Sequence, residues 1–235
     1  MKFKAVAFDL DGTLYPNHRF YFRLIPFLFR HSPYLMAFGK ARSRLRLKSK
    51  SKAEDYAMFY KVQAKYMAEI IKPKTTHNSS YIEEIEAKTE KIIYRGWEPL
   101  FKKVKLFPYV NETLASIRDK GLKLAILSDF PLKTKLEYLK LEKLWDIELC
   151  SEHIGRLKPD PLAFRALCKS LDLPPQDILY VGNSFSYDVI GAKNAGLKTA
   201  WIKPKVTRFF PDKKKESQTD FVFFDYRQLN KFVLS

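Results

Sequence analysis

The sequence predicts an α/β protein: a doubly wound parallel sheet into which an all-helical segment is inserted. Two observations lead to this prediction. Short apolar segments alternate with helical patterns over most of the 235 residues, which is typical of parallel βαβ units. The stretch 16–104 breaks the alternation, because it contains several long helical patterns and no convincing strand.

The strands of the predicted sheet are short apolar runs. They are expected at 5–8, 123–127, 146–150, 178–182, 198–202 and 221–224. Helices are expected between them at 110–121, about 161–171 and about 187–195. In the first of these helices Leu114 and Ile117 supply the inward stripe, and Gly121 is a C-terminal stop signal.

The long helical stretch predicts a second domain. Its clearest helical patterns run over 53–71 and 81–101. Because it separates the first strand from the rest of the sheet, we divide the chain into a core and a helical insertion. The core is residues 1–15 and 105–235, and the insertion is residues 16–104.

The chain is strongly basic, with 43 Lys and Arg against 26 Asp and Glu and a formal net charge of +17. The insertion holds 19 of the basic residues and 8 of the acidic ones, and no acidic residue occurs between Asp11 and Glu54. A one-sided charge of this kind attracts anionic partners: phosphorylated metabolites, nucleic acid or an acidic membrane surface. Charge alone does not choose among them.

Several features predict a cytoplasmic protein. The two cysteines, Cys150 and Cys168, stand among apolar neighbours without a Cys or His at metal-ligand spacing, so buried free thiols are expected. The first apolar run is too short for a secretory signal. The hydrophobic segment 20–39 is interrupted by two arginines and two prolines, so we do not expect it to cross a membrane.

The motif FDLDGTLY, residues 8–15, places two aspartates at the end of the first predicted strand. In strand geometry Asp9 and Asp11 point to the same side, so their carboxylates are expected to converge at the edge of the sheet where ligands bind. Mg²⁺ would relieve the repulsion between them, since it prefers oxygen ligands. Taken alone, the motif is equally consistent with a simple turn at Asp11 and Gly12.

Polar residues also follow three other predicted strands. Ser128 comes directly after the second strand, Lys158 lies in the loop after the third, and Asn183 and Asp188 follow the fourth. Because carboxyl ends of parallel strands meet at one edge, we expect these side chains to lie near Asp9. A hydroxyl, an ammonium and oxygen ligands together suit a phosphoryl group that a carboxylate attacks.

With these residues the sequence resembles the haloacid dehalogenase superfamily, whose four motifs recur in order as FDLDGTLY, LS (127–128), LKPDP (157–161) and VGNSFSYD (181–188). The resemblance implies a Rossmann-like core, a cap formed by the insertion, and an Mg²⁺-dependent phosphatase acting on a small phosphate monoester. It implies Asp9 as the nucleophile that forms an aspartyl-phosphate, and Asp11 as the general acid and base. It further implies phosphate binding by Thr13, Ser128 and Lys158, and Mg²⁺ binding by Asp9, Asp11, Asn183 and Asp188.

Two positions depart from the family pattern. Asn183 stands where the family commonly has Asp, which removes a negative charge from the metal site, so weaker Mg²⁺ binding is expected. Asp129 stands where the family often has Asn, and it either touches substrate or turns the chain into Pro131. Asp11 favours a phosphatase over a dehalogenase, because the dehalogenases lack this carboxylate and a halide leaving group needs no proton.

Other functions remain open. Within the same fold the alternatives are a phosphoryl-transferring mutase and a haloacid dehalogenase. In another class, a basic cap binds nucleic acid or an anionic membrane above a degenerate site. The basic run 40–50 is more typical of a solvated face or loop, and His18 lies near enough to the first motif to face the cleft. Four aromatic residues of the cap fit helix packing better than substrate contact: Tyr56, Phe59, Tyr60 and Tyr66.

Overall fold

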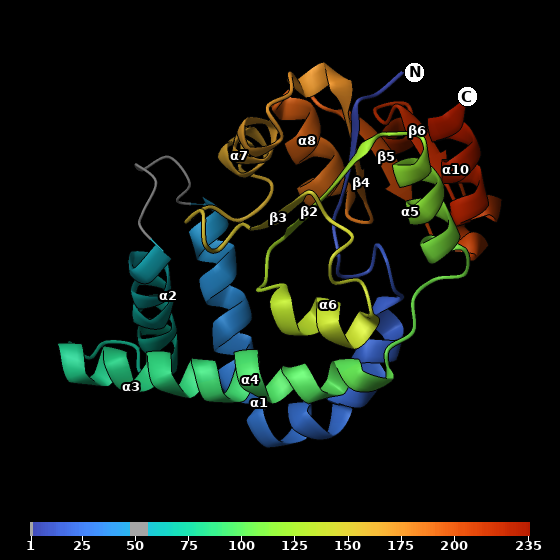
Figure 1. Ribbon diagram of the computed structural model, residues 1–235. Coiled ribbons are helices and arrows are strands. Elements are labelled where there is room, and N and C mark those ends of the chain that lie inside the picture. The colour runs from blue at the N-terminus through green and yellow to red at the C-terminus, as the bar shows by residue number, and fades with distance from the viewer. Residues whose placement is uncertain (1, 48–55) are drawn as a thin grey trace.

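The computed structural model describes residues 2–47 and 56–235. Its centre is a six-stranded parallel sheet with the strand order β3-β2-β1-β4-β5-β6 (Figure 1). The strands are β1 (Ala5–Phe8), β2 (Lys123–Ser128), β3 (Ile147–Cys150), β4 (Ile178–Gly182), β5 (Lys198–Ile202) and β6 (Phe221–Phe223). The predicted α/β fold is confirmed, and each predicted strand end is correct to within one residue.

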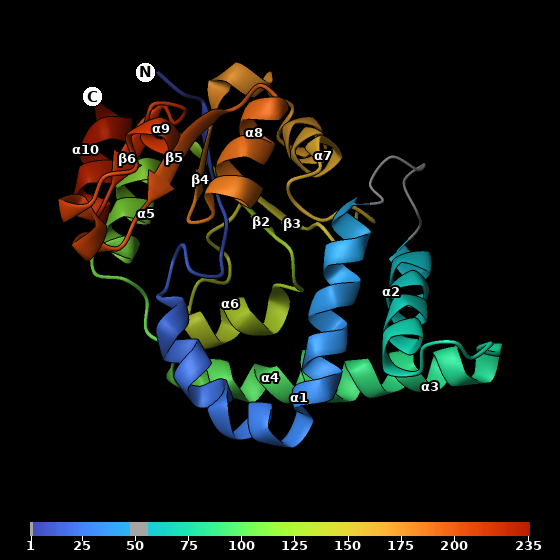
Figure 2. The ribbon, with the colours of Figure 1, turned by 180° about the vertical axis from the view of Figure 1, so that it is seen from behind.

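Helices cover both faces of this sheet. They are α5 (Val110–Asp119), α7 (Pro161–Leu171), α8 (Ile190–Asn194) and α10 (Tyr226–Leu234). Alternation along β1 supplies both cores: Val6 and Phe8 pack with α5 and α10, whereas Ala5 and Ala7 pack with α7 and α8 (Figures 1 and 2). The sheet is therefore doubly wound, and its polar carboxyl edge is left for the loops.

Two of the predicted helices differ in their details. The helix predicted at 110–121 ends at Asp119, and Gly121 follows it with a φ of +75°, as the stop signal indicated. The helix predicted at about 187–195 is shorter, because residues Phe185–Val189 form a π-helical turn before α8 begins. This turn carries Asp188 at the edge of the sheet.

The insertion is helical wherever the structure describes it. Its elements are α1 (Asn17–Leu47), α2 (Tyr56–Ile71), α3 (Ser79–Thr89), a π-helical turn (Glu90–Tyr94), α4 (Arg95–Trp97) and a 3₁₀ helix (Glu98–Lys103). No strand occurs in 16–47 or 56–104. The start of the helix predicted at 53–71 lies outside the described residues.

A bend in α1 brings its end back to the sheet. His31 has the non-helical angles φ −129° and ψ 17°, two residues before Pro33. Proline lacks an N–H and its ring clashes with the carbonyl four residues earlier, which is a common cause of a kink. The first half of α1 leaves the sheet beside β1, and the second half returns to the loops after β2 and β3 (Figures 1 and 2).

The cap has an apolar cluster of its own and also shares the main core. Phe38, Met67 and Ile93 belong to the cluster between the cap helices. At the two ends of the insertion, Phe20 and Phe101 stack with ring centroids 4.7 Å apart and join the core beneath the sheet edge. The cap is therefore packed onto the core through apolar contacts at both of its ends.

Two expectations about the whole chain can be compared with the structure. Cys150 and Cys168 are free and buried, as predicted. Among the helices of residues 2–47 and 56–235, none combines the length and apolar character that a membrane crossing requires.

Candidate active site

Asp9 lies at the carboxyl end of β1, one residue beyond Phe8. Its side chain is nearly buried, with 5% of the residue exposed. The Thr13 hydroxyl donates a hydrogen bond to Asp9 Oδ2 at 2.7 Å. The phenol of Tyr226 in turn donates to the main-chain oxygen of Thr13 at 2.6 Å. The loop after β1 is thus fixed from the opposite side by the first residue of α10.

Asn183 lies on the other side of this loop. The Thr13 hydroxyl is 3.4 Å from Asn183 Oδ1, and the Trp201 indole donates to the main-chain oxygen of Asn183 at 2.9 Å. Gly12, which precedes Thr13 in this loop, lies against the Asn183 side chain and has a φ of +87°. A Cβ at position 12 would lie 2.4 Å from the Asn183 amide nitrogen, so only glycine allows this approach.

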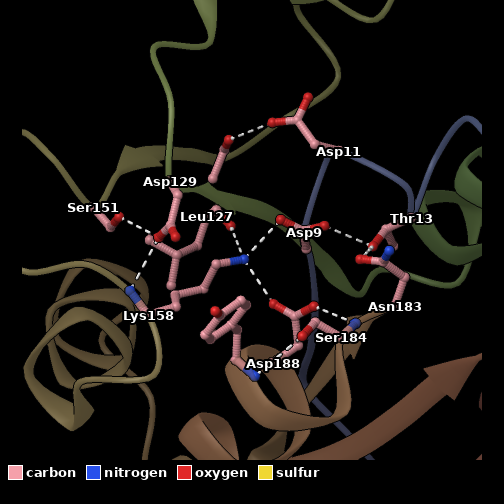
Figure 3. Close-up of polar contacts among 12 residues, drawn as sticks. Asp9, Asp11, Thr13, Leu127, Asp129, Ser151, Lys158, Asn183, Ser184 and Asp188 are labelled. Atoms are coloured by element: carbon pink, nitrogen blue, oxygen red, sulfur yellow. Dashed lines mark hydrogen bonds and ion pairs between the residues drawn. The ribbon is translucent and has the colours of Figure 1, made fainter. Parts of the chain in front are cut away.

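Lys158 connects two buried carboxylates. Its Nζ lies 2.7 Å from Asp9 Oδ1 and 2.7 Å from Asp188 Oδ1 (Figure 3). It also donates to the Tyr180 phenol at 3.1 Å. Burial would lower the pKa of Lys158, but Asp188 and Asp9 outweigh this effect and hold the pKa well above its ordinary value. Lys158 is therefore a permanent cation at the centre of the site.

The pKa of Asp9 is raised to about 7. Burial is the largest cause; the nearby Asp188 and Asp11 add to it, and Lys158 opposes it. One lysine does not neutralise the two buried carboxylates that it joins. A further cation beside Asp9 would favour the carboxylate form that a nucleophile requires.

Asp188 is held by its own loop. The main-chain N–H of Ser184 donates to Asp188 Oδ2 at 2.9 Å, and the Ser184 side chain accepts from the N–H of Tyr187 at 3.2 Å. A Cβ at Gly182 would lie 2.3 Å from the Cβ of Asp188. The glycine that ends β4 therefore lets Asp188 fold back over the strand and reach Lys158.

The carboxylates of Asp9 and Asp11 do not converge as strand geometry led us to expect. The strand ends at Phe8, so alternation no longer decides where Asp11 points. Asp11 Oδ1 and Oδ2 instead accept from Lys135 Nζ at 2.8 and 2.7 Å, and the Tyr15 phenol donates to Oδ1. The Ser128 hydroxyl donates to Asp11 Oδ2 at the long distance of 3.4 Å.

Lys135 was not found from the sequence. It lies in α6 (Lys133–Leu139), seven residues beyond Ser128 and outside all four motifs. Its Nζ stands 5.0 Å from the ring centroid of Phe101 and 4.9 Å from that of Phe130. A basic stretch, KTK, was the only sequence signal, and such stretches usually face solvent.

Lys135 also lines a cavity of about 750 Å³ between the cap and the core. The cap contributes Tyr60, Tyr94 and Trp97 to its wall, and the loop after β2 contributes Phe130. Tyr60 lines this cavity and also packs against the rings of Phe59 and Tyr94, as expected for a cap aromatic. The expectation of packing also fits Phe59 and Tyr66, which are buried, while the side chain of Tyr56 is outside the described part.

His18 is exposed and lines a second cavity, of about 500 Å³. Gly12 and Asn183 form its inner wall, and Lys203 and Tyr226 also border it. His18 therefore faces this second cavity, whose lining includes neither Asp9 nor Lys158.

The cap reaches the site through the end of α1. Arg42 contacts the carboxylate of Glu152, a fully buried residue of the loop after β3, and the phenols of Tyr60 and Tyr94 donate to the same carboxylate at 2.9 and 3.1 Å. Burial raises the pKa of Glu152, with Arg42 opposing. The expectation of a solvated basic run is therefore wrong for Arg42 and Arg46, whereas Lys40 and Arg44 are exposed as expected. Residues 48–50 lie outside the described chain.

Asp129 joins loops of the core to one another and to the cap. Its Oδ1 accepts from the Ser151 hydroxyl at 2.5 Å and from the main-chain N–H of Lys158 at 3.0 Å. Its Oδ2 accepts from Arg46 of the cap at 2.8 Å. Asp129 thus ties the loops after β2 and β3 to each other (Figure 3), and through Arg46 it ties them to α1.

The donors near Asp9 fit a magnesium ion. No group of three or more His, Cys, Asp and Glu side chains in residues 2–47 and 56–235 is arranged as a metal cluster. Of the four expected ligands, Asp9 and Asp188 offer carboxylates and Asn183 an amide oxygen, whereas the carboxylate of Asp11 is paired with Lys135. The single proton of the Thr13 hydroxyl can serve only one of its two neighbours, Asp9 and Asn183. Mg²⁺ suits such a set, since it often takes one or two carboxylates and keeps several waters.

The fold and this edge of the sheet define a class of protein: an α/β enzyme core with a buried carboxylate and lysine cluster beneath a helical cap. The comparison with protein families agrees with this class. The family model for haloacid dehalogenase-like hydrolases matches residues 3–196. The chain therefore belongs to the haloacid dehalogenase-like hydrolase family, which confirms the resemblance seen in its four motifs.

Individual relatives include named phosphatases. A phosphoglycolate phosphatase of Haemophilus influenzae (strain 86-028NP) is 29% identical over 149 residues, which cover 62% of this chain but slightly less than two thirds, 65%, of that protein. A pyrophosphatase of Halalkalibacterium halodurans is 25% identical over 233 residues, 94% of this chain and 95% of that protein. The crystal structure of a 2-haloacid dehalogenase from Pseudomonas syringae pv. tomato matches with a TM-score of 0.63 at 24% identity, over 99% of this chain and 98% of that one, which shows the shared fold.

Proposed function

We propose that the protein is an Mg²⁺-dependent phosphatase that hydrolyses a small phosphate monoester through an aspartyl-phosphate, in the cytoplasm. The observation that supports this most directly is Lys158, buried and 2.7 Å from both Asp9 and Asp188 at the carboxyl edge of the sheet. The phosphatases among the relatives support the same class of reaction.

In the first step, an oxygen of Asp9 attacks phosphorus and the bond from phosphorus to the leaving oxygen breaks. Lys158, Thr13 and Ser128 bind the other phosphoryl oxygens, and Asp11 gives a proton to the leaving oxygen. Bound between Asp9, Asp188 and Asn183, Mg²⁺ would neutralise phosphoryl charge. Lys135 donates to both oxygens of Asp11, so Asp11 must leave Lys135 before one of these oxygens is free to deliver a proton.

In the second step, Asp11 removes a proton from water, and the water attacks the aspartyl-phosphate. The bond between phosphorus and Asp9 breaks, which restores the carboxylate and releases inorganic phosphate. In this step Lys135 is the ion-pair partner of the Asp11 carboxylate that acts as the base. The leaving group departs on the side of Asp11, toward the cavity that Lys135 lines.

The proposal is tested with a panel of phosphorylated metabolites, by measuring inorganic phosphate with Mg²⁺ and with EDTA. We expect turnover of at least one phosphate monoester and its loss with EDTA. Release of phosphate from no member would contradict the proposal. Transfer of the phosphoryl group to a second site of the same molecule would identify a mutase, and halide release from a 2-haloacid would identify a dehalogenase.

A second function, binding of the cap to an anionic membrane surface, is favoured by exposed apolar side chains on α1. Phe22, Ile25 and Phe29 are spaced three and four residues apart, so they share one face, and Phe22 and Phe29 are 69% and 86% exposed. No acidic residue lies between Asp11 and Glu54. An apolar helix face in a basic surrounding suits an interfacial position on anionic lipid more than a nucleic-acid groove.

We expect the protein to bind vesicles that contain phosphatidylserine and not vesicles of phosphatidylcholine, with binding that weakens as salt is added. Sedimentation with vesicles measures this. The variant Phe22→Ser/Phe29→Ser should bind at least about tenfold more weakly, because two aromatic side chains no longer enter the interface. Phe209→Ser/Phe210→Ser changes an equally exposed pair elsewhere and serves as the control. Binding to duplex DNA but not to vesicles would contradict this second function.

A further inference from the structure

Arg46, in the last turn of α1, brings a guanidinium group of the cap to the loops of the candidate site. Its side chain is 18% exposed. One Nη donates to Asp129 Oδ2 at 2.8 Å, and Nε donates to the main-chain oxygen of Lys158 at 3.0 Å. The guanidinium carbon lies 4.5 Å from the ring centroid of Tyr187. One cap side chain therefore contacts the loops after β2, β3 and β4.

These three contacts adjoin the candidate site residues. Asp129 directly follows Ser128, Tyr187 directly precedes Asp188, and Lys158 is contacted itself. Asp129 also accepts from the main-chain N–H of Lys158 at 3.0 Å. The N–H of Lys158 is thus held by the core and its C=O by the cap, and together these bonds fix the backbone from which the lysine side chain enters the site.

The contact between Arg46 and Asp129 is an ion pair. Burial alone would raise the pKa of Asp129, but Lys158, Arg46 and Arg42 outweigh it, so the pKa lies below its ordinary value. Arginine suits this position because its planar group donates to a carboxylate and a carbonyl at the same time, whereas lysine offers a single compact charge.

We propose that Arg46 is a positioning residue that couples the cap to the placement of Lys158 beside Asp9. This inference rests on the phosphatase function proposed for the same site. With the cap over the sheet, as here, Arg46 holds the loop of Lys158; if the cap moves away, that loop keeps its bond to Asp129 but loses its bond to Arg46. Arg42 differs, since it fastens the cap to Glu152 and Asp129.

The test compares Arg46→Gln with Arg44→Gln. Arg44 lies half a turn away, is 48% exposed and pairs with Glu69 inside the cap, so it controls for loss of a cap arginine. With p-nitrophenyl phosphate as the probe, Arg46→Gln should lower kcat about 10- to 100-fold, because displacing a catalytic group by about 1 Å costs that much. KM should change less than about threefold, and Arg46→Lys should restore part of kcat. Arg44→Gln should retain the wild-type kcat.

Asp129→Asn distinguishes positioning from direct substrate contact. It removes the charge that pairs with Arg46 and keeps an oxygen that can accept from the main-chain N–H of Lys158. We expect a loss of kcat similar to that of Arg46→Gln. The double variant Arg46→Gln/Asp129→Asn should show no further loss, because both changes break the same ion pair between Arg46 and Asp129. A purely substrate-binding Arg46 would instead raise KM in Arg46→Gln alone.

Three results would overturn the proposal: a raised KM with unchanged kcat in Arg46→Gln, a wild-type kcat in Asp129→Asn, or equal losses in Arg46→Gln and Arg44→Gln. Hydrogen exchange distinguishes failure of the proposed coupling from failure of the proposed phosphatase function. If the wild-type protein hydrolyses no probe, the phosphatase proposal fails, and exchange of the peptide around Lys158 still tests the coupling. Faster exchange in Arg46→Gln, but not in Arg44→Gln, supports it, and equal exchange in both overturns it.

Discussion

Asp9→Asn is expected to abolish phosphate release and leave the protein folded. The amide keeps an oxygen that accepts from Lys158 and can donate to the Thr13 hydroxyl, so the contacts of Asp9 are largely preserved. It has no nucleophilic oxygen, however, and no aspartyl-phosphate can form. We expect a fall of at least about 10³-fold in kcat on the best substrate of the panel, measured as released phosphate.

Asp177→Asn is the matched control. Asp177 pairs with Lys4 at 2.8 Å and directly precedes β4, at the end of the sheet opposite to the site. This variant should keep wild-type activity, and both variants should have wild-type circular dichroism. Appreciable turnover by Asp9→Asn would mean that another residue attacks phosphorus, and the proposed mechanism would be wrong.

Lys158→Met is expected to cost about 3–5 kcal/mol of unfolding free energy as well as activity, because removing one partner leaves buried charge uncompensated. Lys158 is 3% exposed, and it is the ion-pair partner of both Asp9 and Asp188. Without it the two carboxylates lie close together in a dry site, where one must take up a proton or the region must open to water. Unfolding in urea, followed by circular dichroism, measures the loss.

Two further variants, a control and a rescue, test this expectation. Lys198→Met removes a lysine that is 48% exposed and pairs with Asp220, so it should cost at most about 1 kcal/mol. Lys158→Met/Asp188→Asn removes one of the two stranded charges and should recover part of the stability lost in Lys158→Met. If Lys158→Met is as stable as Lys198→Met, the buried ion pairs are not a main source of stability here.

The positions of Asp9, Lys158 and Asp188 could be predicted because they depend on strand topology. A strand needs only a short apolar run, and the carboxyl ends of parallel strands meet at one edge whatever the loops do. Asp9 follows β1, Asp188 follows β4, and Lys158 follows β3 in the chain. The strand patterns and the order of the motifs therefore predict that the three side chains lie together, and Lys158 Nζ is 2.7 Å from an oxygen of each aspartate.

Asp11, Lys135 and Arg46 could not be placed in this way. Asp11 lies past the end of β1, where alternation no longer sets the direction of a side chain. Its partner Lys135 comes from α6, and Arg46 comes from a cap helix whose bend at His31 turns it back to the sheet. A long, flexible Lys or Arg side chain can reach many oppositely charged partners, and only the packing of the whole chain selects the one that it contacts.

The sheet, its polar edge and the family of the protein could all be predicted from the chain, since they depend on short-range periodicity and on motif spacing. The connection of the cap to that edge could not: Arg42 contacts Glu152, and Arg46 contacts Asp129 and the backbone of Lys158. The physical reason is that such contacts join residues 83 to 112 positions apart, whose meeting depends on helix direction and packing and not on any local pattern.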